Sequence, residues 1–158
     1  MPRVRHVTQQ LTHCLATTHC TGINSRPGAL LGIQFKNSTG EHEIVSMNLA
    51  TKDTTTLYKF DAEEDQLHLR LSTIDSTQQT YFCVTQDVHN PKRNTLHGVN
   101  VAGRNLRFSH HFDGSLITAL EYDEVHALLY GVHTRKAADG SYSSALFAYD
   151  AAADSVSD

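Results

Sequence analysis

The sequence predicts an all-β fold built from three repeats of about 50 residues. An apolar tetrapeptide occurs at residues 30–33, 81–84 and 129–132, and the third positions of these segments lie 51 and 48 residues apart. Two further landmarks, both short polar residues, recur with nearly the same step. They are Asn48, Asn100 and Asp150 in one set, and Asn24, Asp75 and Asp123 in the other.

Composition narrows the class of protein. A chain of 158 residues that is 39% hydrophobic is long enough for one domain with a core. The net charge of −4 gives no basic field for nucleic acid or an anionic membrane. No apolar run approaches the ~20 residues of a membrane span, and the first residues lack a signal-peptide core. Three cysteines make no disulfide framework. We therefore expect a soluble cytoplasmic protein without a cofactor.

The middle repeat shows the expected strands most clearly. Residues 67–74 alternate between apolar and polar with a period of two, which is typical of a half-buried strand. Residues 75–79 form a polar turn, and residues 80–84 are rich in β-favouring side chains. Two more strands are expected at 96–101 and from 106. This order predicts a small antiparallel sheet of four strands.

The other two repeats follow the same order. The third repeat has a short fourth segment at 155–157. No segment predicts a helix of ten or more residues. The expected strands are 21–23, 30–35, 43–49 and 54–60 in the first repeat, and 117–122, 127–133 and 145–149 in the third.

Three segments of the last repeat resemble the first three strands of a β-propeller blade. They are residues 119–123, 129–132 and 146–150. The resemblance is to the broad quinoprotein-like, NHL-like and strictosidine-synthase-like propellers, and it covers residues 18–158. The Trp-Asp signature of WD40 blades is absent because the chain has no Trp, and the paired glycines of kelch blades are absent too. The resemblance thus implies an architecture, and it carries over no active-site motif. The alternative is a β-trefoil, which also has three repeats and twelve strands.

The expected organisation is one domain in four parts. Residues 1–17 are an N-terminal strand segment, 18–66 the first blade, 67–114 the second, and 115–158 an incomplete third. Closed propellers have four to eight blades, so three blades leave unburied faces. We therefore expect a homo-oligomer, such as a dimer that completes a six-bladed ring, or a larger assembly. In the dimer, residues 4–11 would pair beside residues 145–149 of the partner.

Alternation along the strands predicts which residues are buried. Leu31, Phe82 and Tyr130 occupy equivalent positions and are each expected in the core, while their neighbours point to the opposite face. Those neighbours are small, which suits a crowded inner strand. We interpret the repeated Asn and Asp residues as turn-forming side chains. The small neighbours are Gly32, Cys83 and Gly131.

Two groups of residues have the types needed for chemistry. His13, Cys14, His19 and Cys20 could hold Zn²⁺, but five residues separate the two cysteines and no second pair follows. We predict no metal site there, although the sequence leaves metal binding by these four residues open. Cys83 falls in a core strand, where packing is the expected role.

The loops between second and third strands and those between blades share one end of a propeller. Loops on a rigid scaffold often carry function, and here they are mixed in charge and rich in hydrogen-bonding groups. We predict that this end binds a ligand. The candidate ligand-binding residues are His42, His89, Lys92, Arg93, His110, His111, Asp113, His133, Arg135 and Tyr142.

The leading functional hypothesis is a non-catalytic module that recognises a protein or a glycan through this loop face. One alternative is a lactonase-like propeller hydrolase, with Asp75 or Asp123 at a central metal. Another is a lectin on a β-trefoil. The sequence contains no glycine-rich phosphate loop and no nucleophile elbow.

Overall fold

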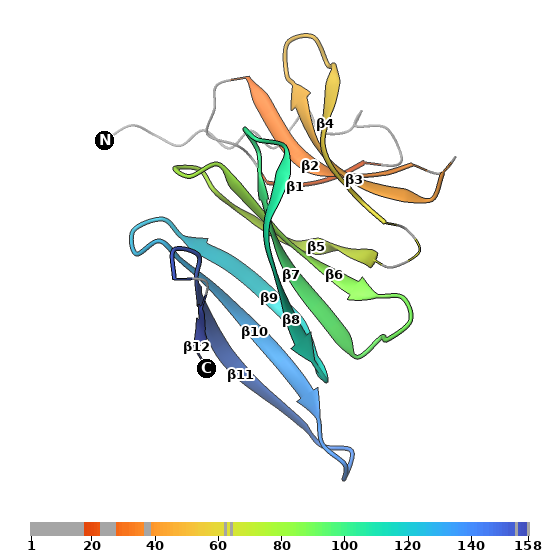
Figure 1. The fold of residues 1–158 in the computed structure, drawn as a ribbon, viewed down its shortest axis with the longest axis vertical. Helices are drawn as coiled ribbons and strands as arrows, with labels where there is room; N and C mark the ends of the chain where they lie inside the picture. The colour runs from red at the N-terminus through yellow and green to blue at the C-terminus, as the bar shows by residue number, and fades with distance from the viewer. Residues whose placement is uncertain are drawn as a thin grey trace, which may run out of the picture.

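The computed structural model describes residues 18–22, 28–36, 39–61, 63, 65–153 and 155–157. These residues form three four-stranded antiparallel sheets, each a meander in chain order (Figure 1). The first sheet, blade 1, consists of β1 (Thr18–Gly22), β2 (Ala29–Lys36), β3 (Glu41–Asn48) and β4 (Thr54–Phe60).

The second sheet, blade 2, consists of β5 (Asp65–Asp75), β6 (Thr80–Asp87), β7 (Arg93–Asn100) and β8 (Asn105–Asp113). The third sheet, blade 3, consists of β9 (Ser115–Asp123), β10 (Leu128–Lys136), β11 (Tyr142–Asp150) and β12 (Ser155–Ser157).

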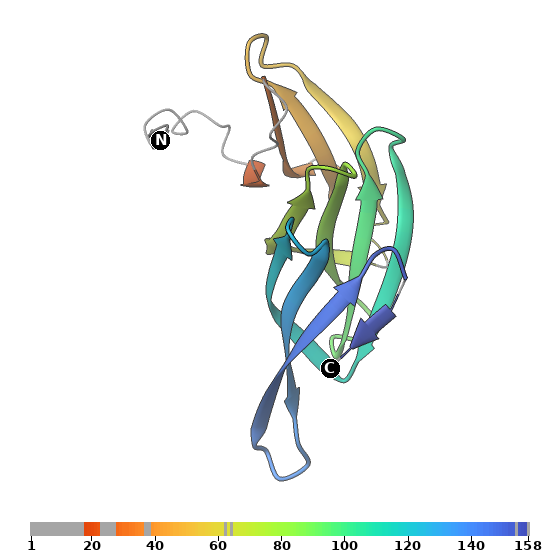
Figure 2. The ribbon, with the colours of Figure 1, turned by 90° about the vertical axis from the view of Figure 1, so that its left-hand side faces the viewer.

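The three sheets stand side by side as a propeller-type array. The first strands of neighbouring blades lie next to each other, since β1 contacts β5 and β5 contacts β9. Each sheet packs with one face against a neighbouring sheet, and the sheets are twisted, as Figure 2 shows. The predicted fold class is therefore confirmed. A β-trefoil does not fit, because each sheet contains the strands of one repeat only.

The repeated Asn and Asp side chains cap turns, as the sequence predicts. Asn48 Oδ1 accepts hydrogen bonds from the N–H groups of Ala50 and Thr51 at 2.9 and 3.2 Å. Asn100, Asp150, Asp75 and Asp123 accept backbone N–H bonds in the same way from residues two or three positions later. This Asx arrangement explains why short polar residues recur there. Asn24 lies outside the described residues.

The outer edge of blade 3 is only partly covered by its own chain. β12 pairs with Ala148, Tyr149 and Asp150 of β11, and its register reaches no further. The segment expected to fill such a slot in a partner, residues 4–11, lies outside the described residues. The closure of the array by a second copy stays a prediction.

The core lies in two layers, one on each face of blade 2. Toward blade 1, Leu31, Ile33 and Ile44 pack against Tyr81 and Val99. Toward blade 3, another apolar layer forms between the two sheets, with Phe82, Val84 and Leu96 against Leu129, Phe147 and Tyr149. Alternate residues of β6 thus face opposite neighbours, which accounts for its unbroken apolar run.

The expected burial of the three equivalent strand residues is right for two of them. Leu31 and Phe82 are fully buried, because each faces the following blade. The expectation for Tyr130 is wrong, since this side chain is only partly buried. It lies on the face of blade 3 that has no following blade among the described residues.

The small residue at position 131 has a specific steric cause. A Cβ atom on Gly131 would lie 2.2 Å from the ring of Phe147, its cross-strand partner on β11. The ring therefore covers the glycine directly, and crowding by a neighbouring blade is not needed to explain the small residue. Gly98 is covered in the same way by Phe108.

Replacing Phe82 by Ala should destabilise the protein by about 3–5 kcal/mol, because the substitution leaves a cavity between blades 2 and 3. Urea unfolding of the wild type and the variant measures this difference. Val125, which is 86% exposed, provides a control: its replacement by Ala should change stability by less than about 0.5 kcal/mol. Equal losses in both variants would contradict the assigned packing.

Replacing Gly131 by Ala should cost about 1–3 kcal/mol through overpacking against Phe147. The double variant Gly131→Ala/Phe147→Leu should be more stable than the sum of the two single effects, because the shorter side chain makes room for the methyl group. Thermal unfolding of the four proteins tests this. Strict additivity would show that the ring is not what excludes a Cβ atom.

Candidate functional site

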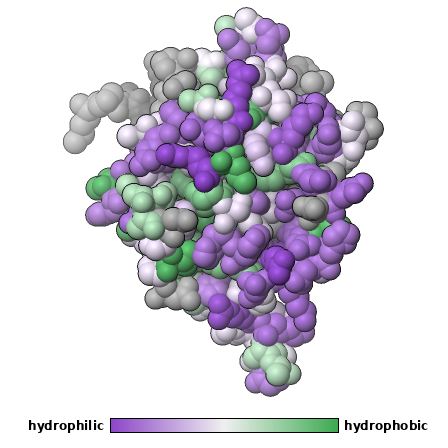
Figure 3. Space-filling view, in the orientation of Figure 1, coloured by the Kyte–Doolittle hydropathy of each residue, from purple (hydrophilic) through white to green (hydrophobic). Residues whose placement is uncertain are grey.

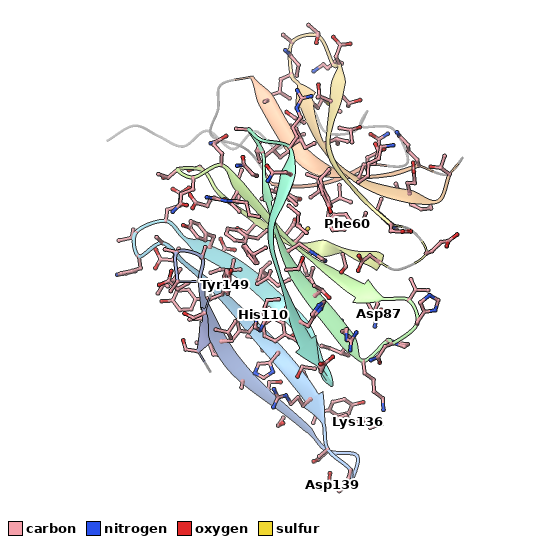
Figure 4. The ribbon with its side chains drawn as sticks, in the orientation of Figure 1. Phe60, Asp87, His110, Lys136, Asp139 and Tyr149 are labelled. Carbon is pink, nitrogen blue, oxygen red and sulfur yellow. The ribbon has the colours of Figure 1, made fainter. Side chains whose placement is uncertain are left out.

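A cleft opens between blades 1 and 2 at the end that carries the loops between second and third strands. It has a volume of about 560 Å³, and we call it the inter-blade cleft. Figure 4 labels Phe60 at the end of β4 and Asp87 at the end of β6, which border it from the two blades. The lining residues are Tyr58, Phe60, Asp61, Asp65, Asp87, His89, Arg93, Thr95, His97, Leu106, Ser109 and His111.

The cleft exists because the blade 2 face that meets blade 1 changes character along its strands. Near the turns after Asp75 and Asn100 this face carries Tyr81 and Val99, which are fully buried in the apolar layer. Toward the opposite end the same face carries polar side chains, which pack less closely across the interface. They are Thr85, Thr95, His97, Ser109 and His111, brought together by the antiparallel register of β6, β7 and β8.

A chain of hydrogen bonds runs along one wall of the cleft. Thr85 Oγ1 donates to Asp65 Oδ1 at 2.7 Å. Thr85 Oγ1 also lies 2.8 Å from His97 Nε2, and His97 Nδ1 lies 2.8 Å from Ser109 Oγ. Because the Thr85 proton is used toward Asp65, the neutral imidazole must donate through Nε2 and accept through Nδ1. The Ser109 hydroxyl therefore donates to His97, and all the bonds in the chain point the same way.

Burial keeps His97 uncharged. Desolvation, assisted by the nearby His111, lowers the pKa of His97 to about 4. The edge of its ring meets Phe60 of blade 1 at a centroid distance of 5.0 Å. Burial also raises the pKa of the Asp65 carboxyl, against the effect of the Thr85 hydrogen bond. The wall therefore consists of uncharged hydrogen-bonding groups held in fixed orientations, and it ends at the carboxyl group of Asp65.

Arg93 supplies the guanidinium group of the cleft. Its Nε donates to Asp113 Oδ1 at 2.8 Å, and its Nη1 lies 3.7 Å from Asp87 Oδ2. Asp87 also accepts the backbone N–H groups of His89 and Asn90, and these bonds lower its pKa. One carboxylate therefore both forms the β6–β7 turn and orients Arg93 at the rim.

The candidate residues from the sequence divide between several places. His89, Arg93 and His111 line the cleft, and Asp113 binds Arg93 beside it. Lys92 and Tyr142 instead line a second hollow of about 480 Å³, which Leu116, Lys136 and the β10–β11 turn also border.

The remaining four candidates line neither the cleft nor the second hollow. His42 contacts Phe35 in blade 1, with a ring-centroid distance of 4.9 Å, and burial lowers its pKa. His110 faces blade 3 beside Tyr149 (Figure 4). His133 is buried near Ser115, and the Nε of Arg135 donates to Ser115 Oγ at 2.7 Å. The ten residues therefore do not form one site.

Sequence reasoning missed the inner wall of the cleft. Thr85, His97 and Ser109 belong to the strands β6, β7 and β8, whereas the sequence predicts ligand-binding residues at the loop end of the propeller. The sequence pattern that could have identified these residues is a polar side chain at a strand position where alternation predicts burial. Thr85 is fully buried and His97 is nearly so. A buried polar group needs a partner, and several such groups on adjacent strands indicate a shared network.

Among the described residues, no group of three or more His, Cys, Asp and Glu side chains is arranged to hold a metal ion. His13 and Cys14 lie outside the described part of the chain, while His19 and Cys20 belong to β1. Cys83 is fully buried in the layer between blades 1 and 2, and burial raises the pKa of its thiol. No helix long and apolar enough to cross a membrane occurs in the described segments.

Comparison with known proteins supports the fold alone. No protein-family model and no curated protein sequence matches the chain. An uncharacterized protein from Listeria monocytogenes EGD-e is similar in structure, with a TM-score of 0.63, 8% identity, and coverage of 89% of this chain and 39% of that one. The beta-propeller domain of the Trilobed protease from Pyrococcus furiosus gives a TM-score of 0.48 at 8% identity, over 85% of this chain and 54% of that one. The chain therefore spans about two fifths to one half of these structures.

His97 should make stability depend on pH. Its pKa is about 4 in the folded protein and about 6.5 when unfolded, so the unfolded chain takes up the proton first as the pH falls. Stability is therefore full above pH ~6.5 and is lost as the pH drops toward ~4, by roughly 3 kcal/mol in total. Urea unfolding at pH 7 and pH 4.5 should show a larger loss for the wild type than for His97→Gln.

An NMR titration of the His97 ring gives a second readout that does not depend on the variant. The ring should remain neutral at pH 5.5. A midpoint near 6.5, or equal acid losses in the wild type and His97→Gln, would contradict the assigned burial of the neutral ring.

Proposed function

We propose that the chain is a binding module that takes a glycan in the inter-blade cleft. The observation that carries the proposal is the combination of pre-oriented polar groups with an aromatic wall in one open cleft. Its volume of about 560 Å³ falls within the range of roughly 300–1,000 Å³ that is typical of small-ligand sites.

The two sides of the cleft suit the two kinds of surface on a sugar ring. Sugar hydroxyls both donate and accept hydrogen bonds, and the cleft offers the carboxylates of Asp65 and Asp87 and the guanidinium of Arg93. The apolar C–H face of a sugar can pack on an aromatic ring. Tyr58 is partly buried and provides such a ring, and the buried Phe60 packs beside it at a centroid distance of 5.0 Å.

Two observations favour binding over hydrolysis. A general base works best with a pKa near the operating pH, and the pKa of His97 is about 4, so this ring is a weak base for activating Ser109. The carboxylates that a lactonase-like site would use, Asp75 and Asp123, accept backbone N–H groups in turns. Asp75 also accepts a 2.7 Å hydrogen bond from the Tyr122 hydroxyl.

A glycan array probed with the labelled protein tests the proposal, followed by calorimetry with any glycan that binds. Replacing Arg93 or Ser109 by Ala should weaken binding about 10- to 100-fold, because each removes a hydrogen-bonding group from the cleft. Both side chains are exposed enough for the variants to keep their fold.

Tyr142→Ala is the matched control, since Tyr142 lies in the second hollow and is 68% exposed. It should leave the affinity unchanged. Loss of binding in Tyr142→Ala with no effect of Arg93→Ala would move the ligand to the second hollow. A blank array together with capture of a protein partner would favour the protein-binding alternative instead.

A further inference from the structure

One face of blade 3 carries apolar residues at the same positions as the faces of blades 1 and 2 that pack against the following blade. The register pairs Ile33 with Ile44 in blade 1 and Val84 with Leu96 in blade 2. All four side chains are fully buried against the following blade. The same positions in blade 3 hold Val132 and Leu146, which the register also pairs.

These positions in blade 3 are not covered. Leu146 is 62% exposed, and Val132 and Tyr130 are only partly buried. Leu116 belongs to the same face, because it pairs with Thr134, which lies two residues from Val132 on β10. Tyr142 also belongs to it, because it lies four residues from Leu146 on β11 and side chains of a strand alternate between faces. Three of the six exposed large hydrophobic residues in the described chain thus share this face.

Isolated exposed apolar residues are ordinary, but several on one sheet face indicate an interaction surface. Figure 3 shows the surface in the orientation of Figure 1 as mainly hydrophilic, with small hydrophobic patches, some over blade 3 at the lower left. We call the set Leu116, Tyr130, Val132, Tyr142 and Leu146 the open face of blade 3.

The opposite end of the array offers a matching surface. Blade 3 meets blade 2 through Leu129 and Tyr149, and blade 2 meets blade 1 through Tyr81 and Val99; these four side chains are fully buried. The equivalent residues of blade 1 are Leu30 and Met47, which the register pairs in the same way. Both are only partly buried.

The charged groups of these two ends lie away from the apolar positions. Glu121 stands opposite Tyr130 on the open face of blade 3 and is exposed. On the blade 1 side, Lys36 and Lys59 stand around the buried Glu43, at 2.7 and 3.1 Å, and keep exposed ammonium groups. Glu121 is level with Tyr130 near the β9–β10 turn, whereas Lys36 is the last residue of β2 and Lys59 lies on the edge strand β4. The packing seen between the other blades would therefore leave these charges apart, and the apolar residues would carry the contact.

We propose that the open face of blade 3 binds blade 1 of a second copy of this chain, head to tail. The contact would place Tyr130, Val132 and Leu146 against Leu30 and Met47, as blades 1 and 2 already do with their successors. Two such contacts close a ring of six blades with two-fold symmetry, which lies within the range of closed propellers.

Light scattering on the purified chain tests the proposal. The wild type should have a mass of about 35 kDa, twice the 17.5 kDa chain. Leu146→Asp and Met47→Asp should each halve the mass, and circular dichroism should show unchanged β content. Val125→Asp, an exposed substitution in the β9–β10 turn, should keep the full mass.

A mixing experiment separates the head-to-tail arrangement from other pairings. Leu146→Asp retains an intact blade 1 face and Met47→Asp an intact blade 3 face, so an equimolar mixture should recover part of the 35 kDa species. No recovery on mixing, or a dimer that Met47→Asp leaves intact, would overturn the head-to-tail contact. A wild-type chain that remains at 17.5 kDa at concentrations of about 100 µM would overturn the proposal as a whole.

Discussion

Face-to-face packing between neighbouring sheets is the constraint on which the structure depends. A four-stranded meander satisfies its internal backbone hydrogen bonds alone, but it buries its side chains only against another sheet. Blade 2 is covered on both faces, and its strand β6 accordingly carries six consecutive buried residues from Thr80 to Thr85. Blade 3 has one covered face, and its strand β10 alternates between buried and partly exposed residues. The burial patterns of β6 and β10 therefore follow the number of covered faces of their blades.

The inter-blade cleft and the open face of blade 3 are two different departures from complete packing. In the cleft, Thr85, His97 and Ser109 occupy positions where an apolar interface would continue, and they satisfy each other through hydrogen bonds. On the open face, apolar residues such as Leu146 occupy interface positions without a neighbouring sheet. A polar network can tolerate water beside it, whereas an apolar face gains free energy by leaving water. This difference is why we assign a small ligand to the first and a protein surface to the second.

The sequence was sufficient for the repeat, the strand order and the turns, because these depend on local chemistry. Asp75 and Asp123 cap their turns through backbone groups two and three residues away, and alternation is a property of each strand alone. The cleft could not be predicted in the same way. His97 meets Ser109 only through the β7–β8 register and meets Phe60 only through the packing of two blades. The burial predicted for Tyr130 was wrong for a related reason. Its position in the repeat predicts which face of the sheet it occupies, but burial also requires a neighbouring sheet against that face.

The polar network in the cleft also limits what the site can do. A hydrogen-bond chain whose bonds all point toward a carboxylate resembles a proton relay, but a relay requires that its imidazole accept a proton at a moderate cost. Burial against Phe60 and the proximity of His111 make protonated His97 unfavourable near neutral pH, since its pKa is about 4. The hydrogen bonds to Thr85 and Ser109 fix the orientation and the tautomer of the ring, which is what a binding site needs in order to hold Ser109 in one orientation. The features that weaken His97 as a base therefore strengthen the wall as a recognition surface.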